Sequence, residues 1–228
     1  MGEGIEQPRS GPTTTGRSGP GAERVFGGWA LILGGALLFG ALLPVVLLPA
    51  PPASPAGIAR WVDAHTVALS ISDEFLFFAV VCLTPAVVVL FRTTRVRKPL
   101  SSLVGASSLL LAIGLLAGLV VVTGRLVYPV FGIALSAETL ALVVSLLFGM
   151  LHAVLLLLGV ALGALAAALR PAGRWLPVVS VGAAALQVLG AFPWLIPAWL
   201  GAATAAALLG WTSAVGWWLV SARSAEWR

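Results

Sequence analysis

The chain has 228 residues, of which 60% are hydrophobic and 9% are charged, and its formal net charge is +5. A soluble domain carries about 25% charged residues, so this composition excludes an ordinary water-soluble fold and favours a protein whose solvent is lipid. The basic excess does not indicate nucleic-acid binding, because the basic residues stand between apolar stretches. The single cysteine, Cys82, excludes an intramolecular disulfide and a paired-cysteine metal site.

The first 24 residues differ from the rest of the chain. Residues 1–24 are rich in Gly, Pro, Ser, Thr and Arg and contain almost no apolar residues, which predicts a disordered tail. The apolar run that follows, 26–49, is longer than the hydrophobic part of a signal peptide, which has about 7–15 residues. We therefore interpret this run as a retained first helix.

A helix needs about 20 consecutive apolar residues to cross the hydrocarbon core of a bilayer. Six stretches without an interior charge meet this requirement, at roughly 26–49, 74–92, 100–123, 139–169, 175–192 and 198–221. We predict an all-α integral membrane bundle in residues 25–222 with a short C-terminal segment, 223–228. The fifth stretch is the weakest because Pro193 and Pro197 crowd its end, and a re-entrant pair in place of the last two helices is an alternative.

The distribution of basic residues predicts the orientation of the bundle. All of the 13 Lys and Arg residues except Arg60 and Arg125 lie in the two terminal segments and in the second and fourth loops. Basic residues are enriched in cytoplasmic loops, so both termini are expected in the cytoplasm. An even number of spans agrees with this. The Ala-, Gly-, Leu- and Arg-rich composition is typical of a bacterial protein, which places the chain in the bacterial plasma membrane as a multi-pass protein.

The first outer loop, roughly 50–73, contains a helix signal of its own. Ser54 followed by Pro55 is a typical helix start. Apolar and aromatic residues then recur at helical spacing, at Ile58, Trp61, Val62, His65 and Leu69. We predict a short interfacial helix lying on the outer membrane surface. An irregular loop packed over the bundle is the alternative.

Capping residues mark the predicted helix ends. Ser72 is expected to cap the second helix, with Asp73 and Glu74 in its first turn, and Ser136 is expected to cap the fourth. The predicted second, third and fourth helices close on basic residues that suit the negative end of a helix dipole, namely Arg92, Arg125 and Arg170.

The fourth helix carries the most informative polar residue. Small residues recur on the same stripe of this helix as His152, which predicts a helix–helix interface. Counting from the outer end places His152 near mid-membrane, and similar counts bring a few hydroxyl side chains to that depth: Thr84, Ser107, Ser108, Thr212 and Ser213. We hypothesise a polar layer of binding residues around His152. The alternatives are a hydrogen-bonded histidine that fixes helix register, a ligand-binding or proton-relay residue, and a haem ligand.

The acids predicted on the outer face allow two interpretations. His65, Asp73, Glu74 and Glu138 can together bind a divalent cation or a cationic ligand, or they can serve in helix capping and solvation alone. The chain contains no set of residues with the spacing of a catalytic or metal centre, so no catalytic residue, metal or cofactor is predicted.

Two groups of motifs resemble a known family. One group is Val62-Asp63-Ala64-His65, then Asp73-Glu74-Phe75-Leu76-Phe77, then a helix ending in Arg92 before a basic loop. The other is Phe148-Gly149-Met150-Leu151-His152, then Leu157-Leu158-Gly159 and a short turn ending at Leu176-Pro177. These resemble a bacterial family of small polytopic membrane proteins, domain of unknown function family 4386, over roughly residues 26–220. The resemblance implies that His152 sits at a position which that family also uses, and it implies no activity.

Three functions are consistent with the sequence. The first is a non-enzymatic membrane protein that binds lipid or a protein partner, including a second copy of itself, through its small-residue faces. The second is a small-molecule transporter or permease subunit with a site at the polar layer. The third is a membrane enzyme, which the lone mid-membrane histidine does not favour. The expected partners are the lipid bilayer and a helix-packing protein partner, and not nucleic acid.

Overall fold

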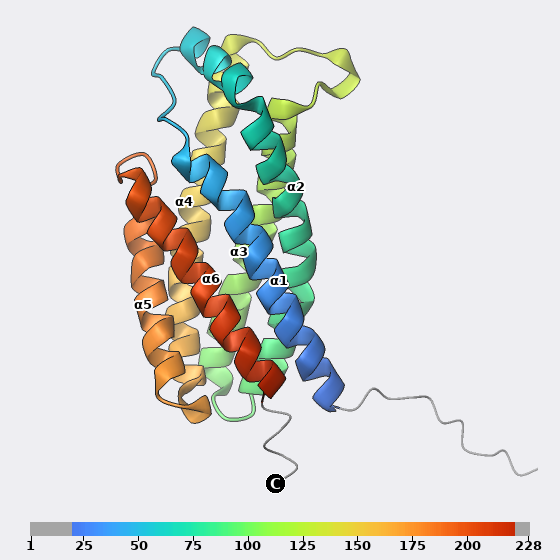
Figure 1. Cartoon of the computed structure of the whole chain (residues 1–228), viewed down its shortest axis with the longest axis vertical. Helices are drawn as coiled ribbons and strands as arrows, with labels where there is room; N and C mark the ends of the chain where they lie inside the picture. The colour runs from blue at the N-terminus through green and yellow to red at the C-terminus, as the bar shows by residue number, and fades with distance from the viewer. Residues whose placement is uncertain (1–19, 222–228) are drawn as a thin grey trace, which may run out of the picture.

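The structure is a computed structural model that describes residues 20–221 (Figure 1). Its described part is all-helical, which confirms the predicted fold class. Six α-helices follow one another along the chain: α1 (Pro20–Leu47), α2 (Pro55–Thr94), α3 (Pro99–Val127), α4 (Ala137–Ala168), α5 (Trp175–Gly190) and α6 (Ala198–Ser221). Two short 3₁₀ turns, η1 (Val130–Gly132) and η2 (Arg170–Ala172), lie in the loops on either side of α4.

The helices form a closed ring in which each packs against the next in sequence and α6 packs back against α1. The ring is crossed by a further contact between α2 and α4. Successive helices run in opposite directions, so α1 begins and α6 ends at the same end of the bundle (Figure 1). That end also carries Arg92, Arg95, Arg97, Lys98, Arg170 and Arg174, and we call it the basic end. The loops 48–54, 128–136 and 191–197 lie at the opposite end.

Five of the helices are long and apolar enough to cross a membrane, and α5 is shorter. The five have between 24 and 40 residues, whereas α5 has 16. At 1.5 Å per residue α5 spans about 24 Å, less than the roughly 30 Å of a hydrocarbon core. Pro193 follows closely after the end of α5 and cannot continue the helix. The fifth helix is thus shorter than the predicted stretch 175–192, and it packs against both α4 and α6.

The prediction of a separate interfacial helix before the second span was wrong. Residues 55–94 form one continuous helix of 40 residues. Between Ile58 and Pro85 there is no Gly or Pro to interrupt it. Ser72 is therefore not a cap: it lies inside α2, where its hydroxyl donates to the carbonyl of Ala41 in α1 at 2.7 Å.

Other predicted helix ends agree with the structure. The side chain of Ser54 accepts the backbone N–H of Gly57 at the start of α2, and Ser136 does the same for Thr139 at the start of α4. Arg92 and Arg125 lie in the last turns of α2 and α3. Arg170 differs, because α4 ends at Ala168 and Arg170 opens η2 instead.

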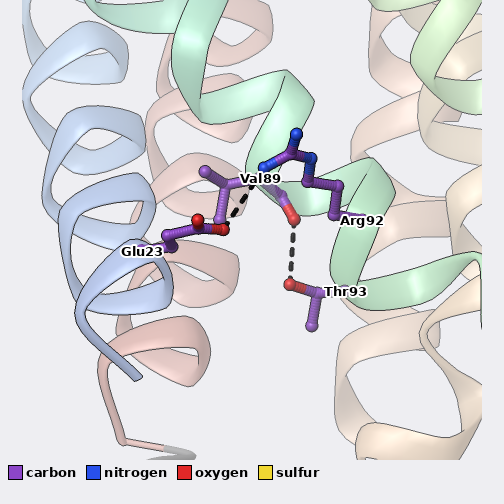
Figure 2. Close-up of polar contacts among 4 residues, drawn as sticks. All are labelled: Glu23, Val89, Arg92 and Thr93. Carbon is purple, nitrogen blue, oxygen red and sulfur yellow. Dashed lines mark hydrogen bonds and ion pairs between the residues drawn. The ribbon is translucent and has the colours of Figure 1, made fainter. Parts of the chain in front are cut away.

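An ion pair joins α1 to α2 near the basic end (Figure 2). Arg92 donates to Glu23 at 3.4 Å, and beside it the hydroxyl of Thr93 donates to the carbonyl of Val89 in its own helix. Both members of the ion pair are about half exposed or more, so the pair contributes little to stability. Of the predicted tail, residues 20–24 belong to α1, and residues 1–19 lie outside the described part, as does the segment 223–228.

Candidate functional site

A cavity of about 940 Å³ lies near the opposite end of the bundle, between α1, α4 and α6. The shortness of α5 explains its place. Because α5 ends at Gly190, the loop 191–197 contacts α4 at His152. From that point to its start at Ala137, α4 extends for about another 22 Å without α5 beside it. On the side nearer the basic end the cavity is lined by this loop. On the far side it is lined by the loop 48–54 and the start of α2.

Trp61 fixes the upper wall of the cavity. Its indole N–H donates to the carbonyl of Pro49 at 2.8 Å, and its side chain is 8% exposed. Pro49, Pro51 and Pro52 have no backbone N–H, so they cannot donate the backbone hydrogen bonds that usually hold a loop in place. The tryptophan supplies the missing donor from α2, twelve residues further along the chain.

The lining is mostly apolar, and its two hydroxyl groups and the indole of Trp61 already have hydrogen-bond partners. None of the described residues that line the cavity carries a charge. Ser145 donates to Ala141 O at 2.8 Å, and Thr204 donates to Leu200 O at 2.9 Å and to Leu186 O at 3.2 Å. The side chains therefore offer apolar surface to a ligand and little that would orient a charged one.

Gly149 is an exposed residue of the cavity lining with open space beside it. It lines the wall formed by α4, and a Cβ atom added to it would meet nothing within 4 Å. Gly163 on the same helix has equally open surroundings but is not part of the lining. Gly159, between them, packs tightly, since a Cβ there would lie 2.7 Å from Val188 of α5. The predicted small-residue stripe thus forms a helix contact at one glycine and open space at the others.

His152 joins α4 to the end of α5. Its Nδ1 atom lies 2.5 Å from the carbonyl oxygen of Ala191, the residue that caps α5. Its ring centroid lies 4.9 Å from that of Phe192 and 5.7 Å from that of Trp194. His152 is half-buried and is not part of the cavity lining, although its neighbour Leu151 is. This arrangement matches the interpretation of a hydrogen-bonded histidine that fixes helix position.

The structure does not assemble the predicted polar layer around His152. Thr84 is exposed and bonds to Val80 O, and Thr212 is buried and bonds to Leu209 O, so each hydroxyl is used within its own helix. Ser108 is buried in α3 and Ser213 is half-buried in α6. Within residues 20–221 no hydrogen bond connects any of these four residues to His152. The hydrogen-bond partner of His152 is Ala191, at the end of α5. The position of Ala191 along the bundle axis depends on where α5 stops, so a count of residues along α4 alone does not predict it.

The outer acids do not converge on a common site with His65. Asp73 is buried against α3, where the absence of a side chain at Gly124 lets the carboxylate approach. Its Oδ1 atom has no hydrogen-bond partner among the described residues. Glu74 accepts the phenol O–H of Tyr128 at 3.0 Å, while His65 packs edge-on against Trp61. In the described part of the chain no three His, Cys, Asp or Glu side chains converge as a metal site would require.

Sequence reasoning missed the cavity and the buried Gln187. Gln187 is 0% exposed, and its amide donates to Thr204 O at 3.0 Å between α5 and α6. The sequence did carry a signal for this bond, because Gln187 is one of only two polar residues, with Ser180, in an apolar helix. The cavity had no such signal, because it arises from a difference in length between neighbouring helices.

Comparisons with protein-family models, with curated proteins and with solved structures found no match for this chain. The resemblance to family 4386 stays a prediction.

Proposed function

We propose that this chain is a non-enzymatic, multi-pass protein of the bacterial plasma membrane, with both termini in the cytoplasm, that binds the acyl chain of a lipid in the cavity between α1, α4 and α6. The observation that carries the proposal is the lining: a space of about 940 Å³ bounded by uncharged residues whose hydroxyl groups are already hydrogen-bonded. That volume lies in the range of roughly 300–1,000 Å³ typical of ligand sites.

The surroundings of the cavity also favour a ligand that comes from the membrane. Trp194 lines the cavity and is nevertheless 53% exposed, so it stands at the mouth. Trp199, at the start of α6, is 70% exposed nearby. Because α4 continues about 22 Å beyond this level, the mouth opens toward the acyl chains of the adjacent leaflet. A lipid tail can enter the cavity from there.

The lining argues against transport of a charged or strongly polar solute. Such a solute would leave its own hydrogen bonds unmade in this cavity, at a cost of a few kcal/mol for each polar group. His152, the residue for which a transport role was weighed, is bonded to Ala191 O outside the lining. A neutral apolar ligand meets neither obstacle.

Photo-crosslinking tests the proposal. The full chain is reconstituted in bilayers containing a phosphatidylcholine with a diazirine near the end of one acyl chain, and the adducts are mapped by mass spectrometry. We expect adducts concentrated on the cavity-lining segment of α4, residues 144–155. Adducts spread evenly over all the lipid-facing helices would contradict the proposal.

A matched pair of variants sharpens the test. Gly149→Phe places an aromatic ring in the cavity, and Gly163→Phe places the same ring on the same helix outside it. Neither new Cβ meets an atom within 4 Å and both positions are exposed, so neither substitution starts inside a packed helix contact. We expect Gly149→Phe to reduce adducts at 144–155 several-fold and Gly163→Phe to leave them unchanged. Equal labelling of both variants would overturn the assignment of the site.

A further inference from the structure

The loop between α3 and α4 exposes an unusual amount of apolar surface. Phe131 is 94% exposed, Ile133 60%, Val130 47% and Tyr128 44%. No charged residue occurs between positions 126 and 137. Exposed loop tips in water normally carry small and polar residues. An exposed apolar patch of this kind therefore marks a surface that contacts something other than water.

The loop is held in shape by side chains of α2 and α3. The guanidinium of Arg125 donates to Tyr128 O at 3.3 Å and to Ile133 O at 2.9 Å, and thus ties both arms of the loop to the end of α3. The phenol of Tyr128 donates to Glu74 in α2 at 3.0 Å. Arg125 was predicted to serve the dipole of α3, and in addition it fixes this loop.

The tip of the loop has a strained backbone. Phe131 has φ 54° and ψ 26°, the left-handed region that a bulky side chain rarely adopts. Such a conformation is strained, and here it points no side chain into the core, since Phe131 is almost fully exposed. Strain combined with exposure of an aromatic ring favours a role in an interaction.

The height of the loop matches the surface of a bilayer. The 29 residues of α3 rise about 44 Å from the basic end, and a bilayer with its headgroup layers is about 40–45 Å thick. In Figure 1 the loop extends sideways beyond the helices and does not fold over the bundle. When the basic end lies at one membrane surface, the loop therefore overhangs the lipid at the other surface.

We propose that the loop 128–136 is an interfacial anchor whose Phe131 ring inserts at the boundary between headgroups and acyl chains of the leaflet at the opposite end. The occupant of this surface is the lipid bilayer itself. The uncharged loop can enter that layer without burying a charge, and aromatic side chains are favoured there. The anchor is independent of the proposed lipid site, which lies between α1, α4 and α6.

Site-directed labelling tests the anchor. In a Cys82→Ala background, Phe131→Cys is labelled with an environment-sensitive fluorophore, and Asp63→Cys, on the exposed face of the protruding start of α2, is the control. We expect the label at 131 to be quenched by nitroxide-bearing lipids and protected from aqueous iodide. The label at 63 should show the reverse. Ile133→Cys provides a second site if Phe131→Cys does not fold.

Two results would overturn the proposal. Quenching of the 131 and 133 labels by iodide, with no effect of nitroxide lipids, would place the loop in water. Protection from both quenchers that disappears on dilution of the protein in the bilayer would instead identify a second copy of the chain as the occupant.

Discussion

The indole N–H of Trp61 and the carbonyl oxygen of Pro49 lie 2.8 Å apart and form the bond that closes the loop between α1 and α2 over the cavity. The bond joins α2 to the loop that precedes it, and its acceptor belongs to a segment in which prolines remove several backbone donors. The shape of the upper wall thus depends on one side chain that both lines the cavity and holds the loop in place.

Trp61→Phe removes this hydrogen bond and keeps an aromatic ring in the wall. A hydrogen bond contributes about 0.5–1.5 kcal/mol net to stability, and water can replace part of this one because Pro49 is exposed. We expect a loss of about 1 kcal/mol in the free energy of unfolding, measured by thermal denaturation in detergent, and fewer acyl-chain adducts at 144–155. Unchanged stability together with unchanged labelling would show that the loop is held by other contacts.

A pair of glycines predicts where the bundle tolerates added atoms. A Cβ on Gly28 would lie 2.6 Å from the backbone oxygen of Gly216, so Gly28→Ala must push α1 away from α6. We expect it to lower the free energy of unfolding by about 1–3 kcal/mol, as overpacking does. Gly114→Ala is the control, since nothing lies within 4 Å of its Cβ and helix propensity favours alanine by up to about 1 kcal/mol. Equal effects of the two changes on thermal unfolding would argue against close packing of α1 on α6.

Much of the fold could be predicted because it depends on local properties of the chain. The apolar stretches had the length that a bilayer demands, and Ser54 and Ser136 were recognisable as caps because capping needs only a side-chain oxygen beside the first helical turns. The continuity of α2 was also present in the sequence, since nothing between Ile58 and Pro85 breaks a helix. It was missed because the helix was limited to the thickness of a membrane.

The site could not be predicted because it depends on the relative heights of helices. The depth of His152 was counted from one end of its own helix, as if all loops at that end lay in one plane. In the structure α5 stops early, so Ala191 meets His152 part-way along α4, and the space above becomes the cavity. Hydropathy fixes which residues are in the membrane, but the register between neighbouring helices comes from packing.

His152→Phe separates a positioning role from a ligand role. The change removes the contact to Ala191 O and keeps a ring beside Phe192 and Trp194. We expect thermal stability to fall by about 1 kcal/mol, the usual scale of an interhelical hydrogen bond in a membrane, and acyl-chain labelling of 144–155 to persist. Loss of labelling without loss of stability would instead assign His152 to ligand binding.

The bond between Tyr128 and Glu74 predicts an alkaline transition in the loop 128–136. The phenol donates to Glu74, and this hydrogen bond raises the pKa of Tyr128 above its ordinary value of 10.0, with the negative charges of Glu74 and Asp73 acting in the same direction. Because the pKa is raised in the folded state, the bond contributes fully below 10.0 and is lost as the pH rises through the folded-state pKa. Ionised Tyr128 would face Glu74 as a second negative charge and would release the loop.

A fluorophore at Phe131→Cys should therefore change its emission only above pH 10.0. The additional change Tyr128→Phe should remove this transition while leaving Arg125 to hold the loop. A transition that persists in the Tyr128→Phe variant would have another origin, and the loop would then not depend on this bond.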